Sequence, residues 1–228
     1  MTAMNRNEQE YLFKLRQKVF DQILNDINKS TIDEIVKKDL VKSHLDNKAS
    51  SDFQNYYFFT LDNEEHYFNS NDFFKQFKKR YALQGIDNNF LYKLEENKKV
   101  ILNSIRADNL AQLYFDTFNK AVIKHGNDFK EKDLGSFFSK LVHTFCPDRY
   151  CALDNPIKNY FGLKKESFFI AFFIISDEYI HWAKENKNLI KIIKEKFRQE
   201  DKKGVLQFEK LTDLKLLDLI FWTKANRQ

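Results

Sequence analysis

The chain has 228 residues, of which 43% are hydrophobic, so it is long and apolar enough to bury a substantial core. The net charge of +5 and the isoelectric point of about 8.9 permit a nucleic acid or another acidic partner without requiring one. Two cysteines, Cys146 and Cys151, are too few for a disulfide framework or a four-cysteine zinc site.

The N-terminal residues lack the apolar core of a signal peptide. The longest apolar run, residues 168–175, is too short to span a membrane. These features predict a cytoplasmic protein with reduced thiols and no membrane partner.

Apolar residues recur at three- and four-residue spacing over residues 7–28, which predicts a first helix. Ser30 and Thr31 are suited to cap a second helix that ends near Asp46. Glu34 is placed for a capping box at the start of that second helix.

Residues 47–71 carry aromatic runs on both sides of a polar turn. This pattern fits either a small β-hairpin near residues 55–68 or an irregular aromatic plug against the core. The remaining chain has a helical pattern. The expected helices cover residues 71–82, 87–105, 107–125, 133–146, 154–161, 165–185, 187–198 and 211–225.

Glycine and proline are rare, with 5 and 2 copies, which favours helices joined by short loops. The sequence therefore predicts an all-α fold with at most one small hairpin. We expect one globular unit, residues 1–228. If it divides into lobes, the boundary near Gly85 gives residues 1–85 and 86–228.

Residues 135–163 are the most specific part of the chain. They predict a buried helix, a proline-containing turn, an apolar step and an acid, Asp154, at the start of another helix. Pro156 suits the first turn of that helix, and aspartate is among the best N-cap residues. Asp154 is therefore either a helix cap and nothing more, or a catalytic carboxylate.

The segment Tyr150 to Phe161, YCALDNPIKNYF, resembles the catalytic-aspartate segment of the helix-hairpin-helix DNA glycosylases, the superfamily of endonuclease III and 8-oxoguanine glycosylase. The upstream Ser139 to His143, SKLVH, with Pro147 and Tyr150, is similar to a divergent bacterial group of 8-oxoguanine-glycosylase-like proteins. The resemblance covers about 30 of the 228 residues.

This resemblance implies a two-lobed helical fold that binds double-stranded DNA and hydrolyses the N-glycosidic bond of a flipped base. It implies that Asp154 stabilises positive charge on the sugar. Lys140 is then a second catalytic candidate. The substrate-binding candidates are Ser136, Ser139, His143 and Asn155.

The chain departs from the superfamily at two places. The Gly-x-Gly turn that grips a phosphate is replaced by residues 132–136, which contain one glycine. Ser136 stands where bifunctional members carry a lysine nucleophile, about eighteen residues before Asp154. These departures favour a monofunctional, water-using enzyme, and we expect no cofactor and no metal.

Basic residues interleaved with phenylalanines occupy the end of one predicted helix: Lys75, Lys78, Lys79 and Arg80. Together with Lys132 and Lys158, they are the candidates for phosphate contact. The alternative is an ordinary solvated helix face.

Two other functions fit the sequence. The first is a non-catalytic helical module that binds DNA or protein in a mobile-element or phage-defence setting. The second is a nuclease in which Asp133, Asp148 and Asp154 gather a magnesium ion.

Overall fold

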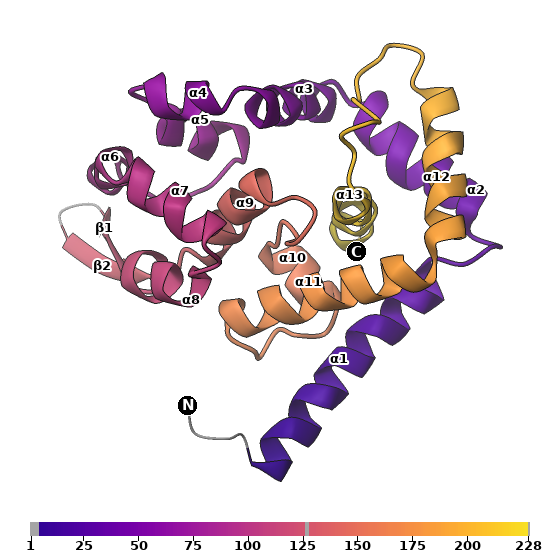
Figure 1. The fold of residues 1–228 in the computed structure, drawn as a ribbon, viewed down its shortest axis with the longest axis horizontal. Coiled ribbons are helices and arrows are strands. Elements are labelled where there is room, and N and C mark those ends of the chain that lie inside the picture. The colour runs from indigo at the N-terminus through magenta and orange to yellow at the C-terminus, as the bar shows by residue number, and fades with distance from the viewer. Residues whose placement is uncertain (1–4, 126–127, 228) are drawn as a thin grey trace.

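The computed structural model describes residues 5–125 and 128–227 as a helical protein with one small sheet (Figure 1). The helices are α1 (Arg6–Asp26), α2 (Ile32–Glu34), η1 (Ile35–Leu45), α3 (Lys48–Asp62), α4 (Glu64–Asn69), α5 (Phe73–Arg80), α6 (Asn88–Glu96), α7 (Lys98–Arg106), α8 (Leu110–Leu113), η2 (Tyr114–Phe118), α9 (Gly135–Phe145), α10 (Asn155–Tyr160), α11 (Phe168–Glu185), α12 (Lys187–Glu200) and α13 (Asp213–Asn226). The predicted fold class, all-α with a small hairpin, is confirmed.

The hairpin does not lie where the sequence pattern placed it. Residues 55–68 belong to α3 and α4, and α3 begins at a cap in which Asn47 accepts the Ser50 N–H. Tyr57, Phe58 and Tyr67 fill the core from helices, so the aromatic pattern reflects helix packing rather than strand alternation.

The first strand of the sheet lies instead at the end of the segment where a helix over residues 107–125 was expected, and the second strand follows it. Strand β1 (Ala121–His125) pairs antiparallel with β2 (Asp128–Lys132), with Ala121 opposite Lys132. The expected helix ends at Phe118, and the β-branched Val122 and Ile123 that follow favour a strand. A two-stranded sheet therefore separates η2 from α9.

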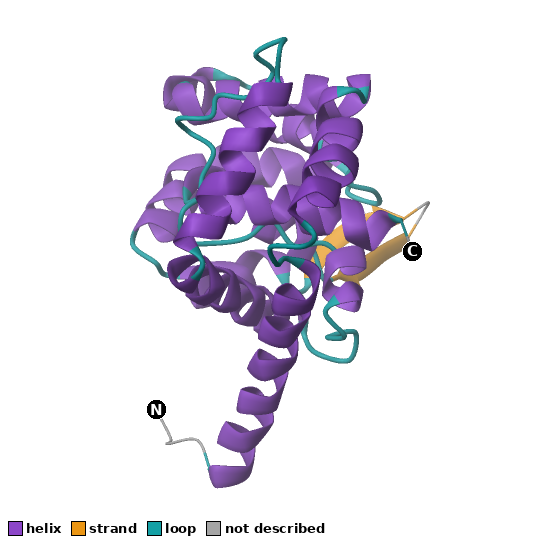
Figure 2. Cartoon of the chain, turned by 90° about the vertical axis from the view of Figure 1, so that its right-hand side faces the viewer, coloured by secondary structure: helices purple, strands orange, loops and turns teal. Residues whose placement is uncertain are grey.

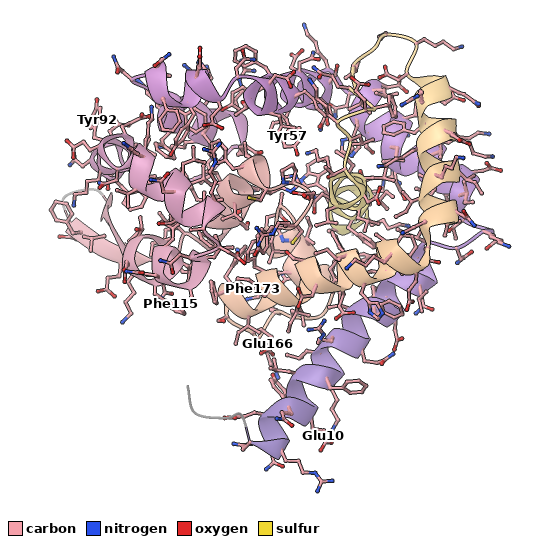
Figure 3. The ribbon with its side chains drawn as sticks, in the orientation of Figure 1. Glu10, Tyr57, Tyr92, Phe115, Glu166 and Phe173 are labelled. Atoms are coloured by element: carbon pink, nitrogen blue, oxygen red, sulfur yellow. The ribbon has the colours of Figure 1, made fainter. Side chains whose placement is uncertain are left out.

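Helix α1 extends away from the rest of the molecule at its N-terminal end (Figures 1 and 2). It begins with a capping box between Asn5 and Glu8 and packs against α11. The Tyr11 hydroxyl donates to Glu166, 2.6 Å away, which lies beside α1 in Figure 3.

Helix η1 is wider than an α-helix at its C-terminal end. The Asp46 N–H donates to the Val41 carbonyl, five residues back, at 3.0 Å. Such π-turns are rare and often occur at functional sites. His44 lies within this widened turn and Asn47 follows it, and both line the pocket described below.

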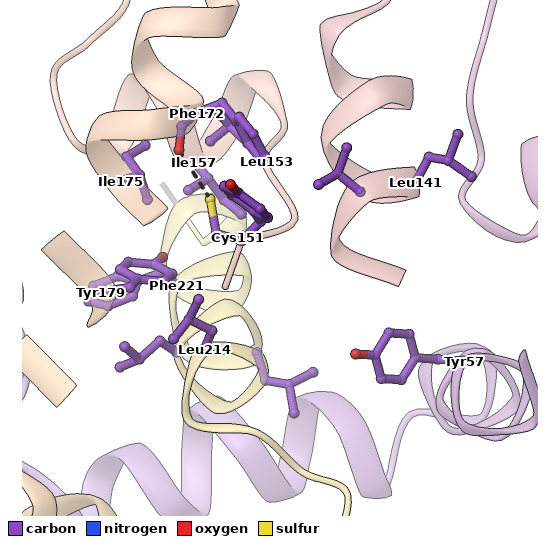
Figure 4. Close-up of a cluster of buried hydrophobic side chains, with 14 of the residues drawn as sticks. Tyr57, Leu141, Cys151, Leu153, Ile157, Phe172, Ile175, Tyr179, Leu214 and Phe221 are labelled. Atoms are coloured by element: carbon purple, nitrogen blue, oxygen red, sulfur yellow. Dashed lines mark hydrogen bonds between the residues drawn. The ribbon is translucent and has the colours of Figure 1, made fainter. Parts of the chain in front are cut away.

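Helix α13 lies at the centre of the fold and is seen end-on in Figure 1. It is buried on nearly every side and packs against η1, α10 and α11. Figure 4 shows Leu214 and Phe221 of α13 in the buried cluster with Cys151, Phe172 and Tyr179. A helix enclosed in this way normally carries no charge, but α13 carries Lys215 and Asp218.

The core is continuous across the expected lobe boundary at Gly85. Helix α1 packs against α11, and η1 packs against α13, so segments from the two ends of the chain lie side by side. The lobes 1–85 and 86–228 stay a prediction, but contacts between them are extensive.

Large apolar side chains also remain at the surface, among them Tyr92 and Phe115 at the edge of the molecule in Figure 3. Among the described helices, none combines the length and hydrophobicity that a membrane crossing needs.

Candidate functional site

A pocket of about 500 Å³ opens between α3, the end of α5, α9, the start of α10 and α13. Aromatic side chains, Phe53, Tyr81 and Trp222, supply much of its wall. The charged residues that line it are Arg80, Lys140, Asp154, Lys215 and Asp218. A concave, partly aromatic site with a few converging polar groups is the usual form of a ligand-binding or active site.

Hydrogen bonds of its own side chain and of the preceding residue hold Asp154 at the pocket. Its Oδ1 accepts the Ile157 N–H at 3.1 Å, which makes it the N-cap of α10. The preceding residue is tied to α9, because Ser139 Oγ donates to the Leu153 carbonyl at 2.7 Å and accepts the Leu153 N–H at 3.2 Å. The capping role is therefore observed, and it uses one carboxylate oxygen.

The other oxygen of Asp154 faces a cation. Lys140 Nζ lies 3.8 Å from Asp154 Oδ2, and the two side chains are 14% and 15% exposed. Burial lowers the pKa of Lys140, while the Asp154 and Asp218 carboxylates act in the opposite direction. The pair is thus partly desolvated at the pocket wall, unlike an ion pair on an open surface.

Lys215 and Asp218 are two further ionisable residues at the pocket, one turn apart on α13, with exposures of only 4% and 5%. Asp218 Oδ2 accepts the Ala152 N–H at 2.8 Å, whereas buried Oδ1 has no hydrogen-bond partner among the described residues. Burial raises the pKa of Asp218 and lowers the pKa of Lys215. Both shifts favour the uncharged forms.

The Lys215 ammonium rests on an aromatic platform. It lies 4.0 Å from the centre of the Tyr57 ring and 5.4 Å from that of Phe53. No carboxylate in the described part of the chain lies within ion-pair distance of it. The ring faces supply a weaker and more diffuse stabilisation than a carboxylate would.

His143 fixes the position of that platform. Its Nδ1 donates to the Tyr150 carbonyl at 2.7 Å, which leaves Nε2 to accept from the Tyr57 hydroxyl at 3.1 Å. Figure 4 shows the Tyr57 hydroxyl directed away from α3 toward the middle of the protein. Complete burial lowers the pKa of His143 to about 3, so the ring is neutral at physiological pH.

The structure brings Lys140 and Asp154 together, but the four substrate-binding candidates are not among the residues that line the pocket. Ser139 and His143 are buried behind the pocket wall, where they hydrogen-bond to the backbone of Leu153 and Tyr150. Ser136 is half-buried in the first turn of α9, and Asn155 is exposed at the start of α10.

The basic candidates divide into two groups. Arg80 lines the pocket, and Lys75 and Lys79 are exposed. The other three, Lys78, Lys132 and Lys158, donate hydrogen bonds to backbone carbonyls of the protein.

Lys132 donates to the Gln84 carbonyl at 2.9 Å, and Lys78 donates to the Ile86 carbonyl. Buried Lys158 donates to the Glu166 carbonyl. Lys158 is therefore not placed to reach a phosphate.

Sequence reasoning missed Lys215 and Asp218. The sequence feature that could have indicated them is a pair of charged residues inside the apolar stretch 214–221, about sixty residues beyond Asp154. It also missed a neighbouring hollow of about 650 Å³ that shares Asn47 and Trp222 with the pocket and is lined by Lys38, Lys42 and Arg227.

The carboxylates that suggested a nuclease have other surroundings. Asp133 Oδ1 accepts from the Tyr114 hydroxyl and from the Gly135 N–H, both at 2.8 Å, and Asp148 is exposed. Within the described residues, no group of three or more histidine, cysteine, aspartate or glutamate side chains is arranged to hold a metal ion.

Comparisons with protein-family models, curated proteins and solved structures found no match to this chain.

Proposed function

We propose that the pocket takes a nucleoside turned out of double-stranded DNA and that the protein hydrolyses its N-glycosidic bond. The observation that carries the proposal is the Lys140–Asp154 pair, 3.8 Å apart and partly desolvated, in an aromatic pocket of about 500 Å³. That volume falls within the range of small-ligand sites. Phe53, Tyr81 and Trp222 offer apolar faces for a base that has left its stack.

In this proposal the two carboxyl groups have opposite tasks. Asp154 faces the sugar as a carboxylate and stabilises the positive charge that develops as the base departs. Asp218, whose pKa is raised by burial, donates a proton to the departing base from its unpaired Oδ1. A water molecule supplies the oxygen that bonds to the sugar carbon, and the proton that this water loses returns to the Asp218 carboxylate.

The mouth of the pocket suits a polyanion. Arg80 lies at one side, and the hollow continues from the other side past Trp222. Its exposed Lys42 lies near Lys38, which pairs with Glu34, and Arg227, which pairs with Asp39. Contact with a phosphate backbone across both sides supports sequence-independent affinity and positions the strand around a displaced nucleotide.

The decisive test is release of a base from duplex DNA carrying a panel of damaged or modified bases, wild type against Asp154→Asn. Asparagine caps helices as well as aspartate does, so the variant keeps α10 and removes the negative charge. Asp87→Asn makes the same exchange at the N-cap of α6 and is the matched control. Abasic product lost in Asp154→Asn and kept in Asp87→Asn supports the proposal; no product from the wild type on a broad panel counts against it.

A non-catalytic DNA-binding module is the second candidate, favoured by the observation that Asp154 already serves as a helix cap. It predicts salt-sensitive duplex binding that is unchanged in Asp154→Asn, with no base release from either protein.

A further inference from the structure

The amino group of Lys215 has surroundings that the proposed hydrolysis does not require. Its side chain is 4% exposed and lines the pocket, and its nitrogen lies over the Tyr57 ring. A lysine placed for structural reasons normally reaches solvent or pairs with a carboxylate. Lys215 does neither among the described residues, although burying an unpaired ammonium is costly.

The charged and titratable groups around Lys215 come from every surrounding element: His44 of η1, Tyr57 of α3, Arg80 and Tyr81 at the end of α5, Lys140 and His143 of α9, Asp154 before α10, and Asp218 of α13. Both histidines are held neutral, since burial lowers their pKa values to about 4 and about 3. Burial is what opposes an ammonium at Lys215, and Asp218 is the carboxyl group that acts on it in the opposite direction.

A buried lysine that lines a pocket and whose pKa is lowered has a larger uncharged, nucleophilic fraction than a surface lysine. We propose that Lys215 is a carbonyl-reactive amine, which forms an imine with an aldehyde or ketone bound in the pocket. The inference uses the same pocket as the proposed hydrolysis, but it does not depend on that reaction.

The step balances with the groups present. The Lys215 nitrogen lone pair attacks the carbonyl carbon, and the C=O π pair moves to the oxygen. After proton exchange between nitrogen and oxygen through Asp218, the nitrogen lone pair expels the oxygen, which leaves as water with a proton from the Asp218 carboxyl. The products are a protonated imine, an Asp218 carboxylate and water.

In the product state the positive charge at Lys215 has partners that stabilise it. The protonated imine lies over the electron-rich face of Tyr57, and the new carboxylate of Asp218 lies one helical turn away. The Ala152 N–H, 2.8 Å from Asp218 Oδ2, already stabilises that carboxylate. The rigid Tyr150–His143–Tyr57 chain of hydrogen bonds keeps the platform in place.

To test this, the full-length protein is treated at pH 7.5 with pyridine-4-carboxaldehyde, which can form an imine with a lysine. Cyanoborohydride in the same solution reduces that imine to a stable amine. Digestion and mass spectrometry then map the adducts. We expect Lys215 to be modified on the order of tenfold faster than exposed lysines such as Lys79 and Lys191, because more of it is uncharged. Adducts spread over surface lysines, with Lys215 modified no faster than they are, would overturn the proposal.

Two further experiments test whether Lys215 is the reacting residue and which carbonyl compound it takes. Lys215→Met should lose the fast adduct, and Asp154→Asn should keep it, so failure of the hydrolysis and failure of this inference are distinguishable. Incubation of the protein with a duplex that carries a single abasic site, followed by borohydride reduction, identifies the source of the carbonyl group. Crosslinking at Lys215 assigns it to ring-opened deoxyribose, whereas reaction with the small aldehyde alone assigns it to a free carbonyl compound.

Discussion

Ser139 and Leu153 are joined by a reciprocal pair of hydrogen bonds. The Ser139 hydroxyl donates to the Leu153 carbonyl and accepts the Leu153 N–H. Both residues are fully buried, so water cannot replace either bond. One serine on α9 therefore fixes the backbone immediately before Asp154, while its neighbour Lys140 supplies the cation that faces the same carboxylate.

Ser139→Ala should destabilise the protein by about 1–3 kcal/mol, because it leaves two buried backbone groups without a partner. Urea or guanidinium unfolding measures this loss. Ser136→Ala on the same helix is the matched control, and we expect less than about 0.5 kcal/mol from it because Ser136 is only half-buried. Equal effects of the two changes would show that the tie to Leu153 contributes little.

Substitutions at Asp154 should separate its capping role from its charge. Asp154→Ala should lower stability by about 1 kcal/mol through loss of the bond to the Ile157 N–H, whereas Asp154→Asn should change stability little. Denaturant unfolding of both variants measures the difference. If Asn is as damaging as Ala, the charge opposite Lys140 contributes to folding as well.

Lys215→Met should stabilise the protein at pH 6 by about 1–3 kcal/mol, because it replaces a buried unpaired ammonium with apolar atoms. The pKa of Lys215 is lower in the folded than in the unfolded chain, so the folded state binds fewer protons between about pH 8 and 10.5. Wild-type stability therefore gains from this group as pH rises through that window.

The advantage of Lys215→Met should accordingly shrink toward pH 10, which denaturant unfolding at several pH values would measure. Lys191→Met, at an exposed position of α12, is the control and should show no such trend. A pH-independent difference at Lys215 would mean that its amino group is charged throughout.

His143 should contribute to loss of stability in acid. Burial lowers its folded-state pKa to about 3, below its ordinary 6.5, so the unfolded state binds more protons between these pH values. Stability supplied by neutral His143 is present above pH 6.5 and is lost as pH falls toward 3. His143→Gln should be less stable at pH 7 and show a shallower decline in acid than the wild type; His181→Gln, at an exposed site, should follow the wild-type slope.

Binding of duplex DNA should depend on basic side chains at both sides of the pocket. Removal of one phosphate contact by Lys42→Gln or Arg80→Gln should weaken binding across sequences and reduce the salt slope by about one. Lys191→Gln, on α12 and outside the pocket, is the control. Fluorescence anisotropy at several salt concentrations gives the slopes, and identical slopes for all three variants would exclude these contacts.

Much of the secondary structure followed from the sequence alone. Helix periodicity and caps placed the helices at Arg6–Asp26, Gly135–Phe145 and Asn155–Tyr160 to within a few residues, because these signals are local. Aspartate before a proline-containing first turn likewise made Asp154 a candidate helix cap, and the structure shows that cap. The hairpin was misplaced because aromatic runs fit a strand and a buried helix equally well, and only packing distinguishes them.

The pocket itself was decided by tertiary structure. Lys215 and Asp218 lie in a segment that reads as an ordinary apolar helix, and nothing local connects them with Asp154. Folding encloses α13 at the centre of the molecule, which buries both charges and places them beside Lys140 and Asp154. The cost of that burial, and the altered proton affinities that result, depend on neighbours brought in from distant parts of the chain.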